Sequence, residues 1–210
     1  MTEEEARAWL QARNVSRETF GQIEAFLSYL REEATRQNLI AASTLDALWA
    51  RHVVDSAQLL DHAAERWGTW LDLGSGAGFP GLIVAIVGSG RVTMIESRTK
   101  RVTFLREAAQ VAGVADRVEV IGSRVETAPR RRYDVISARA FAPLPKLLDL
   151  AQPFTDKSTR FVLPKGRSAP EELAAARASW QGTFRLVPSI TDPEAAIIVA
   201  DGVTPGKTRR

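Results

Sequence analysis

The first third of the chain carries hydrophobic residues at the spacing of amphipathic helices. In segment 17–36 they recur every three or four positions, and Ser16 precedes them as a candidate N-cap residue. Segments 3–13 and 44–64 show a similar pattern. We therefore expect residues 1–66 to form a helical extension that packs against the rest of the chain.

From Thr69 onward, short apolar segments alternate with helical ones. The expected strands are 70–73, 92–96, 118–121, 133–138 and 160–163. The expected helices are 80–87, 100–112, 145–152 and 170–180. This alternation predicts an α/β fold with a doubly wound parallel sheet, formed by residues 67–210. Two last strands, 184–188 and 195–200, are too close in sequence for a crossover helix, so we expect an antiparallel hairpin.

The composition excludes several classes of protein. The chain has 210 residues, of which 45% are hydrophobic and 25% charged, as in ordinary globular domains. It contains no run of roughly 20 apolar residues, and its N-terminus is acidic where a secretory signal would be basic. We expect a cytoplasmic protein that contacts no membrane. Without cysteine and with only two histidines, we expect no disulfide and no metal site.

The basic residues form three small clusters, although the net charge is only +3. Such clusters can bind phosphates, but short basic runs also occur on solvated surfaces of proteins that never bind nucleic acid. The charge pattern is therefore compatible with an RNA partner without requiring one. The clusters are 98–101, 130–132 and 207–210.

A glycine-rich turn directly follows the first expected strand. Four glycines fall within eight positions of the run Asp72-Leu73-Gly74-Ser75-Gly76-Ala77-Gly78-Phe79-Pro80-Gly81. The first three give G-x-G-x-G, which with the preceding aspartate is typical of a site for S-adenosylmethionine. The last three satisfy the dinucleotide pattern G-x-G-x-x-G, but two residues late and with a proline inside the turn. An NAD-dependent oxidoreductase and a purely structural turn are the alternatives.

The residues after the next two strands fit an adenosine site. Glu96 lies about 20 residues beyond the turn, where a carboxylate can accept hydrogen bonds from both ribose hydroxyls. Val125 and Glu126 follow the third strand, where an adenine ring would lie, although Glu126 alone is also an ordinary acid at a helix start. The segment 137–144 lacks the Asn/Asp-Pro-Pro-aromatic motif of adenine amino methyltransferases. The missing cysteine excludes pyrimidine C5 methylation.

Taken together, the motifs resemble the glucose-inhibited division protein B family of small-subunit rRNA methyltransferases. The resemblance runs in order through most of the chain, with small departures at Ile40 and Pro164. The matching stretches are Asn38-Leu39, Arg51-His52 with Asp55-Ser56, Asp72 to Gly81, Lys100-Arg101 with Phe104-Leu105, Ser123 to Glu126, Ala138 to Leu144, and Lys165-Gly166.

The resemblance implies a Rossmann-like class I methyltransferase fold that uses S-adenosyl-L-methionine. It implies methyl transfer to N7 of a guanine in the decoding-region loop of 16S rRNA, with 16S rRNA or the 30S ribosomal particle as partner. Cofactor contacts are implied at Gly74, Phe79, Val125, Glu126 and Arg139. The turn pattern and strand position add Asp72, Gly76, Gly78 and Glu96 as candidates.

The chemistry of this reaction asks for positioning rather than proton transfer. Guanine N7 has a lone pair and no proton, so attack on a sulfonium methyl group needs no general base. We expect Arg139 to bind the cofactor carboxylate and Lys165 an RNA phosphate. Asp55 lies three positions after His52 and four after Arg51. His52 and Asp55 either line the mouth of the site or form a polar pair on a solvated helix face.

Two other classes of function stay open from the sequence alone. A ribosome-binding assembly factor with a vestigial site would not need the intact run from Asp72 to Gly81. A small-molecule methyltransferase would not need the basic clusters. We expect the protein to be a monomer.

Overall fold

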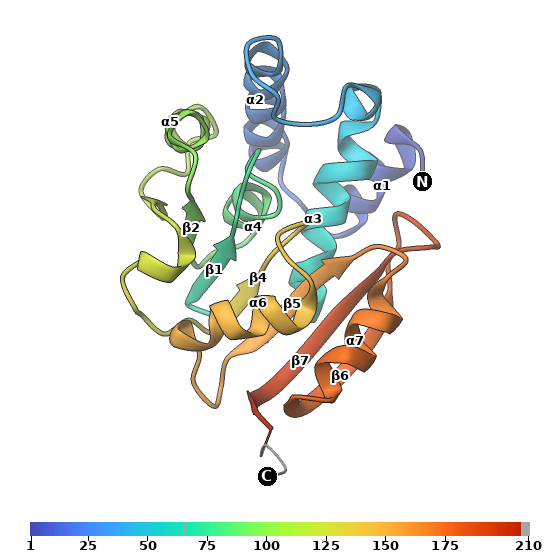
Figure 1. Cartoon of the computed structure of the whole chain (residues 1–210). Helices are drawn as coiled ribbons and strands as arrows, with labels where there is room; N and C mark the ends of the chain where they lie inside the picture. The colour runs from blue at the N-terminus through green and yellow to red at the C-terminus, as the bar shows by residue number, and fades with distance from the viewer. Residues whose placement is uncertain (65, 207–210) are drawn as a thin grey trace.

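The structure is a computed structural model that describes residues 1–64 and 66–206. The basic cluster expected at 207–210 lies outside the described residues. Within them, the chain forms one twisted sheet with helices on both faces (Figure 1). No helix among them is both long and apolar enough to cross a membrane.

The described residues form a seven-stranded sheet in the order β3-β2-β1-β4-β5-β7-β6. The strands β1 to β5 pair in parallel, and β7 is antiparallel to both β5 and β6. This confirms the predicted doubly wound sheet and its antiparallel hairpin. The strand bounds are β1 (Thr69–Leu73), β2 (Arg91–Glu96), β3 (Val118–Gly122), β4 (Val135–Ser137), β5 (Arg160–Lys165), β6 (Trp180–Pro188) and β7 (Ala196–Pro205).

Alternate strand residues enter two hydrophobic clusters, one on each face of the sheet. Trp70 and Met94 belong to the first cluster, whereas Leu71 and Ile95 belong to the second. The helices of the first face are α4 (Gly81–Val87) and α5 (Thr99–Val111). Those of the second face are α6 (Leu144–Ala151), η5 (Gln152–Phe154) and α7 (Ala169–Arg177), while η4 (Val125–Thr127) follows β3.

The helical extension packs on the first face. It begins with α1 (Glu3–Ala12) and α2 (Arg17–Ala34), and the expected cap Ser16 accepts a hydrogen bond from the Thr19 N–H. Phe26 of α2 lies 5.3 Å from the ring centre of Phe79, the residue that follows the last glycine of the G-x-G-x-G motif. The extension therefore reaches the back of the glycine-rich turn.

The helix expected at 44–64 is not a regular α-helix. It consists of the 3₁₀ helix η1 (Ala42–Ala47), the π-helix η2 (Trp49–Val54), α3 (Asp55–Ala57) and the 3₁₀ helix η3 (Gln58–His62). Its irregular start has a tertiary cause, because the Glu3 carboxylate accepts hydrogen bonds from the backbone N–H groups of Trp49 and Ala50. Bonds that a regular helix would make internally are thus made to α1.

The helix α7 ends earlier than the sequence predicts. The helix expected at 170–180 ends at Arg177, and Trp180 is the first residue of β6. Its ring is 7% exposed and belongs to the second hydrophobic cluster, so burial as part of the sheet outweighs the helical pattern. The β6–β7 pair is therefore longer than predicted.

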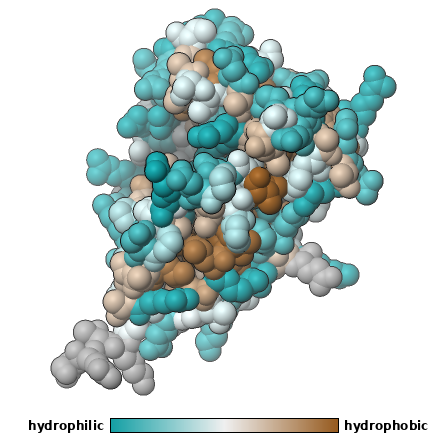
Figure 2. Space-filling view, turned by 90° about the vertical axis from the view of Figure 1, so that its right-hand side faces the viewer, coloured by the Kyte–Doolittle hydropathy of each residue, from teal (hydrophilic) through white to brown (hydrophobic). Residues whose placement is uncertain are grey.

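Figure 2 shows one outer face of the molecule, where hydrophobic areas are small and bordered by hydrophilic side chains.

Candidate functional site

Two adjoining cavities lie at the carboxyl ends of the parallel strands, where a doubly wound sheet places its ligands. The Glu96 cavity, of about 400 Å³, is lined by residues that follow β1, β2, β3 and β4. The Arg139 cavity, of about 620 Å³, is lined by η1, η2, the segments after β4 and β5, and the β6–β7 connection. Both volumes are in the range of small-ligand sites.

The glycine-rich turn supports the Glu96 cavity. Gly74, Gly76 and Gly78 have φ angles of 68°, 55° and 88°, in the left-handed region that favours glycine. Asp72 lies beneath the turn with no exposed surface. Its carboxylate accepts hydrogen bonds from the Gly81 N–H and the Ser137 hydroxyl. The structure thus places Asp72 below the turn, outside the walls of both cavities.

Glu96 fixes the turn from the other side. Its carboxylate is 6% exposed and accepts hydrogen bonds from the backbone N–H groups of Gly76 at 3.1 Å and Arg98 at 2.9 Å. The guanidinium of Arg101 lies 4.0 Å away. A carboxylate oxygen has more than one lone pair, so Glu96 can still accept hydrogen bonds from a ligand in the cavity.

Besides Asp72 below the turn and Arg139 in the wall of the other cavity, the expected cofactor residues form two groups. The walls of the Glu96 cavity bring together Gly74, Glu96, Val125 and Glu126. Gly76, Gly78 and Phe79 support the turn instead: Gly76 bonds Glu96, a Cβ on Gly78 would overlap Leu82, and Phe79 is 3% exposed between Phe26 and His52.

Phe141 forms a wall that the two cavities share, together with its neighbours Ala140 and Ala142. Its ring lies against Gly74 so closely that a Cβ on this glycine would overlap the ring. Ala140 holds a positive φ of 50°, a strained conformation for a residue other than glycine. Sequence reasoning gave Phe141 no role, because its contact with Gly74 joins two strand ends and leaves no local signal.

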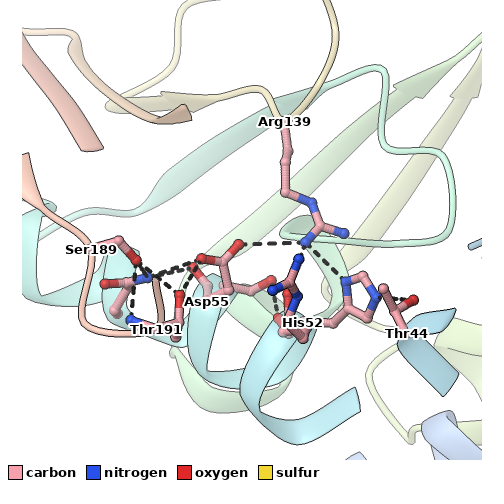
Figure 3. Close-up of polar contacts among 9 residues, drawn as sticks. Thr44, His52, Asp55, Arg139, Ser189 and Thr191 are labelled. Atoms are coloured by element: carbon pink, nitrogen blue, oxygen red, sulfur yellow. Dashed lines mark hydrogen bonds and ion pairs between the residues drawn. The ribbon is translucent and has the colours of Figure 1, made fainter. Parts of the chain in front are cut away.

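Arg139 is the charged centre of the second cavity (Figure 3). Its Nη1 atom lies 3.0 Å from Nδ1 of His52 and 3.5 Å from the Asp55 carboxylate. Asp55 also accepts a hydrogen bond from the Thr191 hydroxyl at 2.9 Å. Asp55 therefore forms an ion pair with Arg139, which lies far from it in the sequence.

His52 and Asp55 line the Arg139 cavity rather than a solvated helix face. The His52 ring is 8% exposed and stacks on Phe79 at 4.8 Å between ring centres. Burial, followed by the positive charges of Arg139 and Arg51, lowers the pKa of His52 to about 3. The imidazole is therefore neutral at physiological pH, and a base with so low a pKa binds a proton only weakly.

Lys165 points inward. Its side chain is 8% exposed, and the ammonium group donates hydrogen bonds to the Ala142 carbonyl and to Glu172, both at 2.8 Å. These bonds tie β5 and α7 to the segment that carries Phe141. The geometry favours a supporting role over the phosphate contact expected from the sequence.

Comparison with known proteins identifies the family of this site. The family model described as "GidB: rRNA small subunit methyltransferase G" matches residues 20–193. A protein of Rhizorhabdus wittichii named "Ribosomal RNA small subunit methyltransferase G" is 55% identical over 98% of this chain and 95% of its own. The chain belongs to the rRNA small subunit methyltransferase G family. A second relative with this name, from Zymomonas mobilis, is 49% identical over 100% of this chain and 98% of its own.

Solved structures support the fold of this rRNA small subunit methyltransferase G family member. An O-methyltransferase from Bacillus cereus in complex with SAH is 16% identical, with a TM-score of 0.56 over 84% of this chain and 90% of its own. Ribosomal protein L11 methylase from Lactobacillus delbrueckii subsp. bulgaricus has a TM-score of 0.57 and 16% identity over 70% and 76%. The chain therefore has the Rossmann-like methyltransferase fold predicted from its sequence.

Three further residues of the rRNA small subunit methyltransferase G site were missed by sequence reasoning. Thr44 and Thr191 bond His52 and Asp55 in the Arg139 cavity, and Lys146 lines the Glu96 cavity. Threonines and a surface lysine carry no distinctive spacing, so only the fold could reveal them.

Proposed function

We propose that the chain transfers a methyl group from S-adenosyl-L-methionine to N7 of a guanine in 16S rRNA. Family membership supports the rRNA substrate. The observation that carries the choice of N7 is the arrangement of His52 in the wall of the Arg139 cavity. Both of its ring nitrogens are engaged, with Arg139 and Thr44, and its lowered pKa makes it a weak base, which fits a nucleophile that has no proton to lose. The relatives are named as methyltransferases, which fits this activity better than a vestigial assembly factor.

The Glu96 cavity has the features that a bound adenosine requires. Glu96 accepts hydrogen bonds from the ribose hydroxyls, and the left-handed Gly74 brings the backbone close to the ligand. Val125 offers an apolar surface and Glu126 a carboxylate at the place of the adenine ring. When bound, S-adenosylmethionine supplies a sulfonium methyl group that an incoming nucleophile can take. No residue of this cavity has to move a proton.

The Arg139 cavity is the proposed place of the guanine. Phe141 separates it from the Glu96 cavity and presents an aromatic ring, on which a purine extruded from RNA can stack. Methyl transfer moves a positive charge onto the purine, and an aromatic face stabilises a cation. Arg139 binds the cofactor carboxylate in this proposal, and Asp55 compensates its charge.

Mapping of the product tests the proposal. Small ribosomal particles and naked 16S rRNA that lack the modification are incubated with the protein and labelled S-adenosylmethionine. The rRNA is then cleaved chemically at 7-methylguanine. We expect one cleavage site in 16S rRNA and no transfer to small metabolites. RNA binding without transfer would instead support an assembly factor, and transfer to metabolites a small-molecule enzyme.

We further propose that the protein works as a monomer in the cytoplasm, where its rRNA substrate is found. The face drawn in Figure 2 has only small hydrophobic areas, whereas permanent interfaces usually bury larger apolar patches, so a permanent partner on this face is not expected. Light scattering of the purified protein would give its mass.

A further inference from the structure

We propose that His52 is a positioning residue, which holds the Arg139 guanidinium for its ligand by accepting a hydrogen bond at Nδ1. Thr44 keeps the His52 ring in the tautomer that this requires. The assignment of a ligand to Arg139 rests on the proposed function, whereas the hydrogen-bond arrangement itself does not.

The direction of each hydrogen bond follows from the groups involved. A guanidinium can only donate, so Nδ1 of His52, 3.0 Å from Arg139 Nη1, must be the acceptor. The hydrogen of the neutral ring is then on Nε2, which lies 3.0 Å from the Thr44 hydroxyl oxygen. The Thr44 hydroxyl donates its own hydrogen to the Ala41 carbonyl at 2.8 Å, so its oxygen is free to accept from His52.

The contacts of Arg139 leave one edge of its guanidinium for a ligand. Its hydrogen bonds to the described residues, with Arg51, His52 and Asp55, all use Nη1. The atoms Nη2 and Nε have no partner among these residues, and both have accessible surface. Arg139 lines the cavity, and the parallel N–H groups of these two atoms suit bidentate binding of a carboxylate.

The ring of Phe79 packs against both the His52 imidazole and the Arg139 guanidinium, and so limits where each can lie. His52 stacks on one aromatic face at 4.8 Å with an angle of 21° between the rings, and the Arg139 guanidinium carbon lies 5.2 Å from the same ring centre. A guanidinium has little rotational freedom when a ring packs against it and an acceptor binds one nitrogen. Only a neutral His52 fits, since an imidazolium would have no acceptor and would repel Arg139.

The ring nitrogens of His52 can be observed directly. In uniformly ¹⁵N-labelled protein at pH 7, long-range proton–nitrogen correlations distinguish the two tautomers of histidine. We expect hydrogen on Nε2 and none on Nδ1. In Thr44→Val the preference for this tautomer should weaken, whereas Thr44→Ser should keep it. Hydrogen on Nδ1, or a charged ring at pH 7, would overturn the proposal whether or not the protein methylates RNA.

A pair of His52 variants tests the effect on Arg139. In His52→Asn the side-chain oxygen takes the place of Nδ1 and can still accept from Arg139, whereas His52→Leu keeps an apolar group on Phe79 but offers no acceptor. Binding of S-adenosylmethionine is measured by calorimetry. We expect the dissociation constant to rise about tenfold in His52→Leu and at most about threefold in His52→Asn.

A double-mutant cycle shows whether His52 acts through Arg139. If it does, His52→Leu should have little effect on binding in an Arg139→Gln background, because no guanidinium is left to position. Equal losses in both backgrounds, or unchanged binding in His52→Leu, would overturn the proposal. Unfolding curves of each variant show whether a loss of cofactor binding only reflects a loss of folded stability. If the unchanged protein does not bind the cofactor, the proposed function fails instead.

Discussion

Asp72 and Glu96 bind the backbone of the glycine-rich turn at two places, but their surroundings differ. Glu96 reaches the cavity and accepts hydrogen bonds from two N–H groups, whereas Asp72 has no exposed surface. Burial raises the pKa of Asp72 to about 6, although the hydrogen bonds that its carboxylate accepts from Ser137 and Gly81 oppose this shift. One carboxylate is placed for a ligand and the other supports the turn.

Removal of the Glu96 carboxylate should weaken cofactor binding. In Glu96→Ala we expect the free energy of S-adenosylmethionine binding to fall by about 1.5 to 3 kcal/mol, the range of hydrogen bonds to a charged group. Calorimetry measures the change, and Glu126→Ala serves as a comparison at the more exposed end of the same cavity. If Glu96→Ala binds the cofactor as tightly as the parent chain, Glu96 does not contact it.

Stability should depend on pH through Asp72. Because its folded pKa of about 6 exceeds its ordinary value of 3.8, folding favours the protonated acid. The contribution of protonated Asp72 to the stability of the fold is fully present below the pKa of the unfolded state, and it is lost as pH rises through about 6. Asn does not titrate, so the unfolding free energy of the parent chain minus that of Asp72→Asn should fall by about 2 to 3 kcal/mol between pH 4 and 7. A difference that stays constant would contradict this burial of charge.

The rate of methyl transfer should be nearly independent of pH around neutrality. N7 has no proton to lose, and His52, with its pKa lowered to about 3, does not titrate in this range. Single-turnover rates at saturating RNA and cofactor should be flat from about pH 6.5 to 8.5. A tenfold rise per pH unit, abolished in His52→Ala, would mean that the enzyme deprotonates its target.

Among the elements, the glycine-rich turn and the Phe141 segment depend on each other. In Gly74→Ala the new methyl group would overlap the Phe141 ring and would also strain a left-handed backbone. Gly202, with a φ of 60° and no atom within 4 Å of an added Cβ, is a matched control for strain alone. Both substitutions should cost about 1 kcal/mol of stability through strain.

Only Gly74→Ala should also weaken cofactor binding, by about tenfold or more. Calorimetry and thermal unfolding measure the two effects, and equal cofactor binding in both variants would show that Phe141 can move aside without consequence.

The sequence predicted a strand or a helix correctly where the local spacing of its residues is enough to stabilise that element. The parallel strands and α5 are examples, since their apolar spacing and flanking glycines are local. The π-helical turn at Trp49 was not predictable, because it depends on the carboxylate of Glu3 in a different helix. The same holds for the site: Glu96 was expected from its place after a strand, whereas the contact between His52 and Arg139 joins elements that are distant in the chain.

In the whole molecule, the basic clusters at 98–101 and 130–132, which the sequence suggests as RNA contacts, lie at opposite ends of the strands. Arg98 and Lys100 are exposed and follow β2, so they lie near the carboxyl end of that strand. Arg131 and Arg132 precede β4 and therefore lie at its amino end. They are also engaged, Arg131 with Glu119 and Arg132 with the Pro153 carbonyl, both at 2.6 Å.

RNA binding should reveal this difference through its dependence on salt. Replacing Arg98 and Lys100 with glutamine should reduce the slope of log affinity against log salt by about 0.7 for each lost phosphate contact. The same change at Arg131 and Arg132 should leave the slope unchanged. Cofactor affinity should be the same in both variants, because none of these four residues lines the Glu96 cavity. Filter binding across a salt series makes the measurement. An unchanged slope in the first variant and a reduced slope in the second would place the RNA on the opposite edge of the sheet.

The two cavities also differ in how much of the chain must be synthesised before each can form. The residues that line the Glu96 cavity all lie between Gly74 and Leu150, whereas those of the Arg139 cavity extend from Thr44 to Ile197. Translation proceeds from the N-terminus, so every wall of the first cavity leaves the ribosome before β6 and β7. A premature stop codon after β5 would spare the former residues and remove Ser189, Thr191 and the rest of the β6–β7 connection. Such a truncated product would keep the residues proposed to bind the cofactor and lose one side of the place proposed for the guanine.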